Sequence, residues 1–167
     1  MKVNDKGYSL VEMIVVIAII VVVAAGGVVG ISTISNRPAQ KVAQIMLTNI
    51  QSNRNIAMGK NSASLKLFVD ASGNIKAEET IDGGSPKTYY LGNEDVDIEV
   101  ESTDGTTVDL ASNDVTLVFD RSTGVIKPFG SESGAMNGKT LKTISVSRAG
   151  KTYIISVSSL TGRVSMN

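Results

Sequence analysis

One apolar run near the start of the chain dominates its hydrophobic pattern. No charged side chain occurs between Met13 and Asn36. A helix of that length is long enough to cross the roughly 30 Å of hydrocarbon in a bilayer. We therefore predict a helix over residues 8–59 whose first half, at about residues 13–34, spans a membrane.

The helical pattern continues beyond this run, but with apolar residues on one face only. They recur at spacings of three, four and seven residues: Val42, Ile45, Met46, Ile50 and Ala57. Such a stripe predicts an amphipathic half, at about residues 38–58, that packs on another layer. Glycine and proline weaken helices, so we expect a bend or flaw between Gly26 and Pro38 and an end at Gly59. The glycines also suit close helix packing in a membrane.

After Gly59 the pattern changes to an alternation of apolar and polar residues, which is typical of half-buried strands. Short strands are expected at residues 65–69, 75–81, 88–91, 95–101, 114–120, 125–128, 141–148, 152–158 and 163–166. Residues 131–139 are expected to form a loop. The pattern predicts an α+β fold, in which a long N-terminal α-helix packs on a C-terminal antiparallel β-sheet or small β-sandwich at residues 60–167.

Glu12 stands one residue before the uncharged run. A charged group near a membrane core costs about 2.5–3.5 kcal/mol, so it marks a functional site whose partner has to be found. Cleavage between Gly7 and Tyr8 would create an α-amino group four residues before Glu12 on the same helix. It would also leave the apolar run at the mature N-terminus, whereas a secretory signal peptide is cut after its apolar region.

The stretch GYSLVEMIVVIAII resembles the class III signal of type IV pilins and type II secretion pseudopilins. The resemblance implies that residues 1–7 are a leader peptide, that prepilin peptidase cuts after Gly7, and that it methylates the new terminal amine of Tyr8. It also implies that Glu12 pairs with the terminal amine of a neighbouring subunit during assembly. Two departures are mild: Tyr8 stands where phenylalanine is usual, and Ser9 where threonine is common.

The same resemblance implies a structural, non-enzymatic subunit that starts as a single-pass protein of the cytoplasmic membrane with its globular domain outside the cytoplasm. It would then enter a type IV pilus or a type II secretion pseudopilus, at the cell surface or in the periplasm. The implied partners are prepilin peptidase, other pilin or pseudopilin subunits, an assembly platform membrane protein, and membrane lipid before assembly.

The C-terminal half carries a weaker resemblance. The runs VTLVFDRSTGVIKPFG and KTYIISVSSLTGRVSMN are similar to the ends of H-type minor pseudopilins and their minor-pilin relatives. This likeness favours a minor subunit. An alternative is a binding module at a filament tip, such as a DNA-uptake minor pilin.

The composition removes most chemistry from consideration. The chain has no cysteine and no histidine, which excludes disulfides, Ser/His/Asp and Cys/His nucleophiles, and the commonest transition-metal ligand. We predict no catalytic residue, no metal site and no cofactor. The minority hypothesis is Ca²⁺ bound by the acidic loops at residues 92–95 and 103–109, although no DxDxDG loop is present.

The net charge is zero, but it is distributed unevenly. Residues 66–120 carry 3 basic and 13 acidic side chains, and residues 121–167 carry 7 and 1. Two such lobes would suit contacts between copies in a fixed register, although solvated strand faces explain them equally well. If the basic lobe contacts DNA, the candidate residues are Lys139, Lys142, Arg148, Lys151 and Arg163. Only one aromatic residue, Tyr153, lies among the closing strands, which weakens the nucleic-acid hypothesis.

Overall fold

The computed structural model describes residues 10–59, 61–93 and 95–167, without the side chains of residue 10 and residues 20–37. The chain divides into two compact units, Met1–Ser35 and Asn36–Asn167, and each is described by itself. Helix α1 runs over Leu10–Met58 and contains Pro38. After it, the N–H of Gly59 donates to the carbonyls of Asn55 and Ile56, at 3.1 and 3.0 Å. Helix α1 is continuous from Gly26 to Pro38, and the bend expected there stays a prediction.

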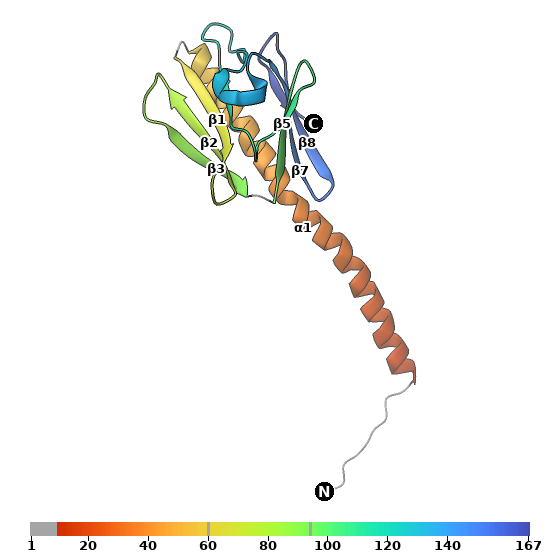
Figure 1. Ribbon diagram of the computed structural model, residues 1–167. Helices are drawn as coiled ribbons and strands as arrows, with labels where there is room; N and C mark the ends of the chain where they lie inside the picture. Colours follow the sequence, from red (N-terminus) through yellow and green to blue (C-terminus); the bar gives the residue numbers. More distant parts are fainter. Residues whose placement is uncertain (1–9, 60, 94) are drawn as a thin grey trace. The chain divides into compact units, whose positions relative to one another are not determined.

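The described residues of the second unit form two antiparallel sheets (Figure 1). The first sheet has the strand order β3-β2-β1-β6, and its strands are Lys87–Asn93, Asn74–Ile81, Ala63–Val69 and Val115–Val118. The second has the order β5-β4-β7-β8-β9, with strands Thr107–Asp109, Asp97–Ser102, Leu141–Arg148, Lys151–Val157 and Val164–Met166. A short 3₁₀ segment, η1, covers Ser131–Met136. The predicted α+β class with antiparallel sheets is confirmed.

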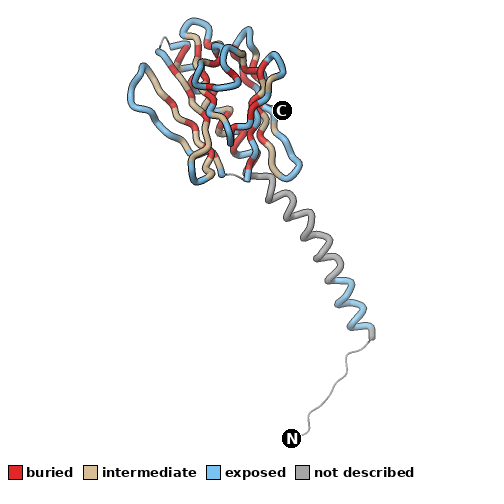
Figure 2. The backbone as a smooth tube through the Cα atoms, in the orientation of Figure 1, coloured by how far each residue is buried: buried red, intermediate tan, exposed pale blue. Residues whose placement is uncertain are grey.

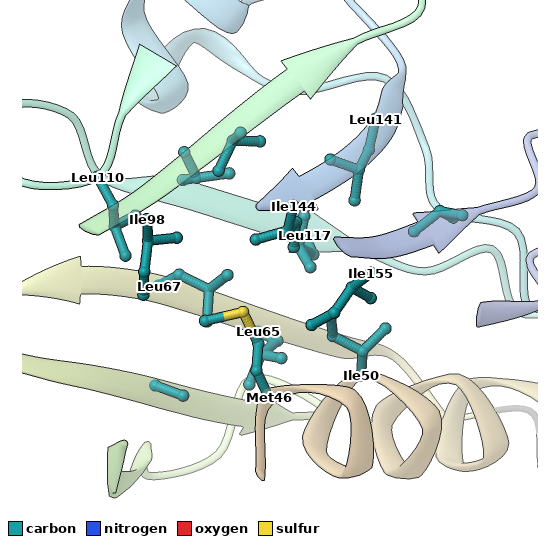
Figure 3. Close-up of a cluster of buried hydrophobic side chains, with 14 of the residues drawn as sticks. Met46, Ile50, Leu65, Leu67, Ile98, Leu110, Leu117, Leu141, Ile144 and Ile155 are labelled. Atoms are coloured by element: carbon teal, nitrogen blue, oxygen red, sulfur yellow. The ribbon is translucent and has the colours of Figure 1, made fainter. Parts of the chain in front are cut away.

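A single apolar cluster joins the helix to both sheets (Figure 2). Met46 and Ile50 of α1 are fully buried, and Figure 3 shows them beside Leu65 of β1 and Ile155 of β8. Of the predicted stripe on α1, only Ile45 is half-buried rather than buried. The amphipathic pattern therefore identifies the face of the helix that packs in the core.

Three segments differ from the sequence prediction. Thr107–Asp109 forms strand β5 against β4, although it is too short to show an alternation of its own. Residues 125–128 make only one bridge, between Ile126 and Phe119, because Pro128 has no N–H with which to extend a ladder. Part of the expected loop becomes η1, whose buried Ser133 accepts a hydrogen bond from the N–H of Thr116 at 3.2 Å.

One polar contact lies where α1 meets the first sheet. Asn53 is 1% exposed and Glu79 is 8% exposed. The amide Nδ2 of Asn53 donates to Oε1 of Glu79 at 2.8 Å, and the hydroxyl of Tyr89 donates to Oε2 at 3.1 Å. A buried carboxylate is costly without such donors, so this contact restricts how the helix lies on strands β2 and β3.

Two glycine loops meet near the C-terminal end of α1. Gly124 and Gly162 both have positive φ angles, of 67° and 63°. A Cβ on Gly162 would lie 2.3 Å from the carbonyl oxygen of Gly124, and a Cβ on Gly124 would lie 2.8 Å from Cγ of Met58. Only glycine allows this approach, so the segments Thr123-Gly124 and Thr161-Gly162 hold the loop after β8 against the end of the helix.

Candidate functional site

Glu12 is the acidic residue in the first turn of α1. Its side chain is exposed and makes no ion pair with any described residue. A carboxylate in this position interacts favourably with the positive end of the helix dipole. The site is therefore a solvent-facing acid at a helix start, available to a cationic group from another molecule.

The side chains on either side of Glu12 in the sequence are apolar and also exposed. Seven of them are between 46% and 67% exposed: Val11, Met13, Ile14, Val15, Val16, Ile17 and Ile19. They occupy all sides of the helix, so the segment has no polar face to present to water. A contiguous apolar surface of this kind marks a contact with lipid or with another protein. Glu12 is the one charged group among residues 11–19.

Three of the seven basic residues of the basic lobe form ion pairs with described residues of the acidic lobe. The pairing of strand β4 with β7 brings the two groups together, in the strands themselves and in the residues that flank them. Nζ of Lys142 lies 2.7 Å from Glu101, a guanidinium nitrogen of Arg148 lies 3.1 Å from Asp95, and Nζ of Lys139 lies 3.1 Å from Asp104. The Lys142 ammonium, with the Thr143 hydroxyl, lowers the pKa of the Glu101 carboxyl.

The ion pairs divide the five candidate DNA-contact residues. Three of them, Lys139, Lys142 and Arg148, each form an ion pair with a carboxylate of the same molecule. Lys151 and Arg163 are exposed and make no ion pair with a described residue. Phosphate neutralisation by the first three would require breaking existing pairs. Nucleic-acid contact stays a prediction that now depends on Lys151 and Arg163.

The acidic loops do not converge on a metal site within the described residues. No three acidic side chains among them gather closely enough to hold an ion. Asp104 accepts hydrogen bonds from the hydroxyl of Ser102 and, at 3.0 Å, from the N–H of Thr106. Asp109 accepts from the N–H of Ala111 at 2.8 Å. These carboxylates stabilise turns, which explains why acidic residues occur there.

The sequence did not indicate a shallow hollow where the C-terminal end of α1 meets strand β9. It is lined by Gln51, Arg54, Asn55, Arg163 and Val164. Arg54 and Arg163 are more than a hundred residues apart in the chain. Only the packing of the last strand beside the helix brings the two guanidinium groups to one place, so no local pattern could have revealed it.

The N-terminal segment matches a known family model. Residues 2–28 match the prokaryotic N-terminal methylation motif, which is the class III prepilin signal of type IV pilins and pseudopilins. The chain therefore carries the processing signal of that class of structural subunits, and the predicted resemblance is confirmed. No curated protein and no solved structure is significantly similar to the chain.

Two parts of the predicted site lie beyond what the structure describes. Gly7 and Tyr8 are outside the described residues, so cleavage and methylation at these positions stay predictions, as does the assembly role of Glu12. Within the described part of the chain, no helix combines the length and the apolar character needed to cross a bilayer.

Proposed function

We propose that the chain is a prepilin, a structural subunit of a type IV pilus or a type II secretion pseudopilus. Prepilin peptidase cuts it after Gly7 and methylates the amine of Tyr8. The mature subunits then assemble through their N-terminal helices. The observation that carries this proposal is the match of residues 2–28 to the methylation motif, with Glu12 exposed among apolar side chains in the first turn of α1.

Before assembly the apolar segment at about residues 13–34 is held in the cytoplasmic membrane, and the second unit lies outside the cytoplasm. The absence of any charge from Met13 to Asn36 supports this arrangement. In the filament, neighbouring helices replace lipid around the same side chains. The assembly platform in the membrane and the other subunits are the partners that this exchange requires.

Glu12 sets the axial register in which the helices pack when neighbouring helices replace lipid. Once apolar helices surround it, an unpaired carboxylate is strongly unfavourable, and a cation at the correct height removes that cost. Cleavage after Gly7 supplies such a cation, the terminal amine of Tyr8 on an adjacent subunit. Processing and assembly are therefore coupled through one ion pair.

Within the family we assign a minor subunit. The support is the likeness of residues 115–130 and 151–167 to H-type minor pseudopilins and minor pilins. The two glycine loops that meet beside Met58 lie in these two runs, which gives both a shared structural role. In sheared filaments a minor subunit is present at a small fraction of the amount of the major subunit.

The test is Glu12→Ala in a host that assembles the wild-type chain. We expect cleavage after Gly7 to be unchanged and incorporation into filaments to fall by more than about tenfold, because breaking a buried ion pair costs roughly 3–5 kcal/mol. Mass spectrometry of the N-terminal peptide measures processing, and immunoblotting of sheared filaments measures incorporation.

Val11→Ala is the matched control, since it removes an exposed apolar side chain from the same turn without changing the charge. It should leave both measurements close to wild type. Normal incorporation of Glu12→Ala would refute the ion-pair mechanism. A functional wild-type subunit that keeps Met1–Gly7 would refute the proposal that it is a processed prepilin.

A further inference from the structure

The hollow beside strand β9 carries two positive charges and no negative one. Arg163 is exposed and makes no ion pair or side-chain hydrogen bond with a described residue. Nη2 of Arg54 donates to the carbonyl of Thr161 at 3.0 Å. The other lining side chains, Gln51 and Asn55, are neutral. Within the described residues, nothing in the molecule neutralises this site.

Arg54 also has an unmet hydrogen-bonding requirement. Its Nε is buried and has no hydrogen-bond partner among the described residues. A buried donor without an acceptor costs about 1–3 kcal/mol. The edge of a guanidinium that presents two N–H groups matches the two oxygens of a carboxylate. The exposed guanidinium of Arg163, which lines the hollow, therefore fits a carboxylate supplied from outside.

The opposite side of the second sheet, at strands β4 and β5, carries unpaired negative charges. Glu99 of β4 lies directly across from Asp109 of β5, and both side chains are exposed. Like charges in such a cross-strand pair are destabilising. Asp97, two residues before Glu99, adds a third carboxylate on this face. None of the three makes an ion pair with a described residue, and they do not form a metal-binding group.

The two surfaces cannot meet within one molecule. In the strand order β5-β4-β7-β8-β9, the acidic residues lie on the first two strands and the hollow lies at the last. Strands β7 and β8 lie between the strand of Glu99 and strand β9, which Arg163 precedes, so a contact between Glu99 and Arg163 requires two copies. A contact between two different surfaces of identical molecules repeats from copy to copy, and it produces an open, helical array where the rotation does not close into a ring.

We propose that the hollow formed by Arg54 and Arg163 binds the acidic face Asp97–Glu99–Asp109 of a second copy of this chain. This inference rests on the proposed function and deepens it, because it names a contact between globular domains that adds to the contact between helices. Each contact places two arginines against three carboxylates, so that most of the unpaired charge on both surfaces is compensated. Electrostatic complementarity of this kind sets orientation.

A charge exchange in the full-length chain tests the contact. Arg163→Glu and Glu99→Arg, each alone, should lower incorporation into filaments by more than about tenfold, because each places like charges together. The two changes in one chain should restore incorporation at least in part, since positions 163 and 99 are then complementary again with their signs exchanged. Both side chains are exposed, so the melting temperature of each variant should stay close to wild type.

Covalent capture provides an independent measurement, because the chain has no cysteine of its own. One copy carries Arg163→Cys and a differently tagged copy carries Glu99→Cys, both full-length, in the same cells. A bismaleimide cross-linker should join the two tags, since an arginine and a glutamate that meet at the ends of their side chains hold their Cα atoms further apart than the roughly 7 Å that a direct disulfide allows. Thr88→Cys, at an exposed position of β3 in the other sheet, replaces Glu99→Cys in the control and should give no such product.

The outcomes separate this inference from the proposed function. Normal processing and assembly that are insensitive to both charge changes would overturn the interface and leave the prepilin assignment intact. A second outcome is loss of assembly in Arg163→Glu, without rescue by Glu99→Arg and without the cross-linked product. It would mean that the hollow binds a different anion, such as DNA phosphate, and it would also overturn the proposed interface. Failure of the wild-type chain to be processed would refute the proposed function itself.

Discussion

At the scale of single residues, three aspartates hold the turns of the second unit. Asp70 accepts hydrogen bonds from the N–H groups of Ser72 and Asn74, at 2.9 and 3.0 Å. Asp120 accepts from the N–H groups of Ser122 and Thr123, both at 3.0 Å. Asp104 has the same role in its own turn. Each carboxylate mimics a turn of backbone, which is why aspartate is favoured there.

These contacts make the fold sensitive to acid. The Lys76 ammonium lowers the pKa of Asp70, and hydroxyl donors from Ser102 and Ser122 lower the pKa values of Asp104 and Asp120. A lowered pKa in the folded state stabilises the fold above the unfolded carboxyl pKa of about 3.9, and this stabilisation is lost as the pH falls below it. We expect the melting temperature to be constant near neutral pH and to fall below about pH 4.

Asp120→Asn isolates one of the three carboxylates. The amide still accepts the turn hydrogen bonds but carries no titrating charge, so the variant should be less stable than wild type at pH 7 and should approach it at low pH. Asp97→Asn controls for net charge, because the side chain of Asp97 has no hydrogen-bond partner among the described residues. A constant difference between wild type and Asp120→Asn from pH 7 to pH 2 would contradict the assignment.

Functional and structural residues could be identified from the sequence only where the signal lies within a short stretch of the chain. Glu12 was recognisable because it belongs to one contiguous motif within residues 2–28. Arg54, Asn53 and Glu79 were not recognised, since their partners lie far away in the chain: Asn53 contacts Glu79 on another element, and Arg54 contacts Thr161. A polar residue in a helical stripe gives no sign of which strand will receive it.

At the scale of elements, the buried half of α1 is the part on which both sheets pack. Met46 has no exposed surface, and its neighbours in Figure 3 come from the helix and from strands. Gly92 of β3 lies so close to the helix that a Cβ there would be 2.6 Å from Cγ2 of Val42. The helix is therefore packed within the fold of the second unit rather than attached to its surface.

Truncation of the stripe should destabilise the whole second unit. Met46→Ala is expected to lower the free energy of unfolding by about 2–5 kcal/mol, through lost burial and the cavity that it leaves. Gln44→Ala, on the exposed side of the same turn, should change it by less than about 0.5 kcal/mol. Urea unfolding measures both variants, and equal effects would show that the stripe is not the packed face.

The long periodic elements were predictable, and the short ones were not. Strand β7 and the stripe of α1 show clear periodicity over many residues, and the structure agrees with both. Strand β5 has three residues, and η1 depends on burial of Ser133 and Met136 beneath neighbouring strands. Such elements exist because of their tertiary contacts, so their sequences contain no periodic signal of their own.

At the scale of the whole molecule, the described core lies entirely within the second unit. Every buried residue of the apolar cluster falls between Ala39 and Val164. Residues 36–167 should therefore fold without the N-terminal segment and unfold in urea in one cooperative transition, with a slope of about 1–3 kcal/mol/M. Because the chain has no cysteine, a reducing agent should not shift the midpoint. A gradual, non-cooperative loss of structure would contradict this expectation.

The charge lobes illustrate what the order of strands adds to composition. The acidic run at residues 95–101 and the basic run at residues 139–148 are far apart in sequence, but β4 and β7 are neighbours in one sheet. Three of the basic residues are therefore paired with acidic residues inside the molecule, although the two groups lie far apart in sequence. Only the topology identifies which residues those are.

The buried contact of Asn53 with Glu79 has a mechanical consequence. A pull along the packed half of α1 acts in the direction in which the helix could slide over β2 and β3. Apolar side chains resist sliding weakly, because one apolar contact can replace another. The carboxylate of Glu79 accepts from the amide of Asn53 and the hydroxyl of Tyr89, and sliding would separate it from both donors. The contact should therefore keep the helix at one axial position until the load is large enough to leave a buried carboxylate without its hydrogen-bond partners.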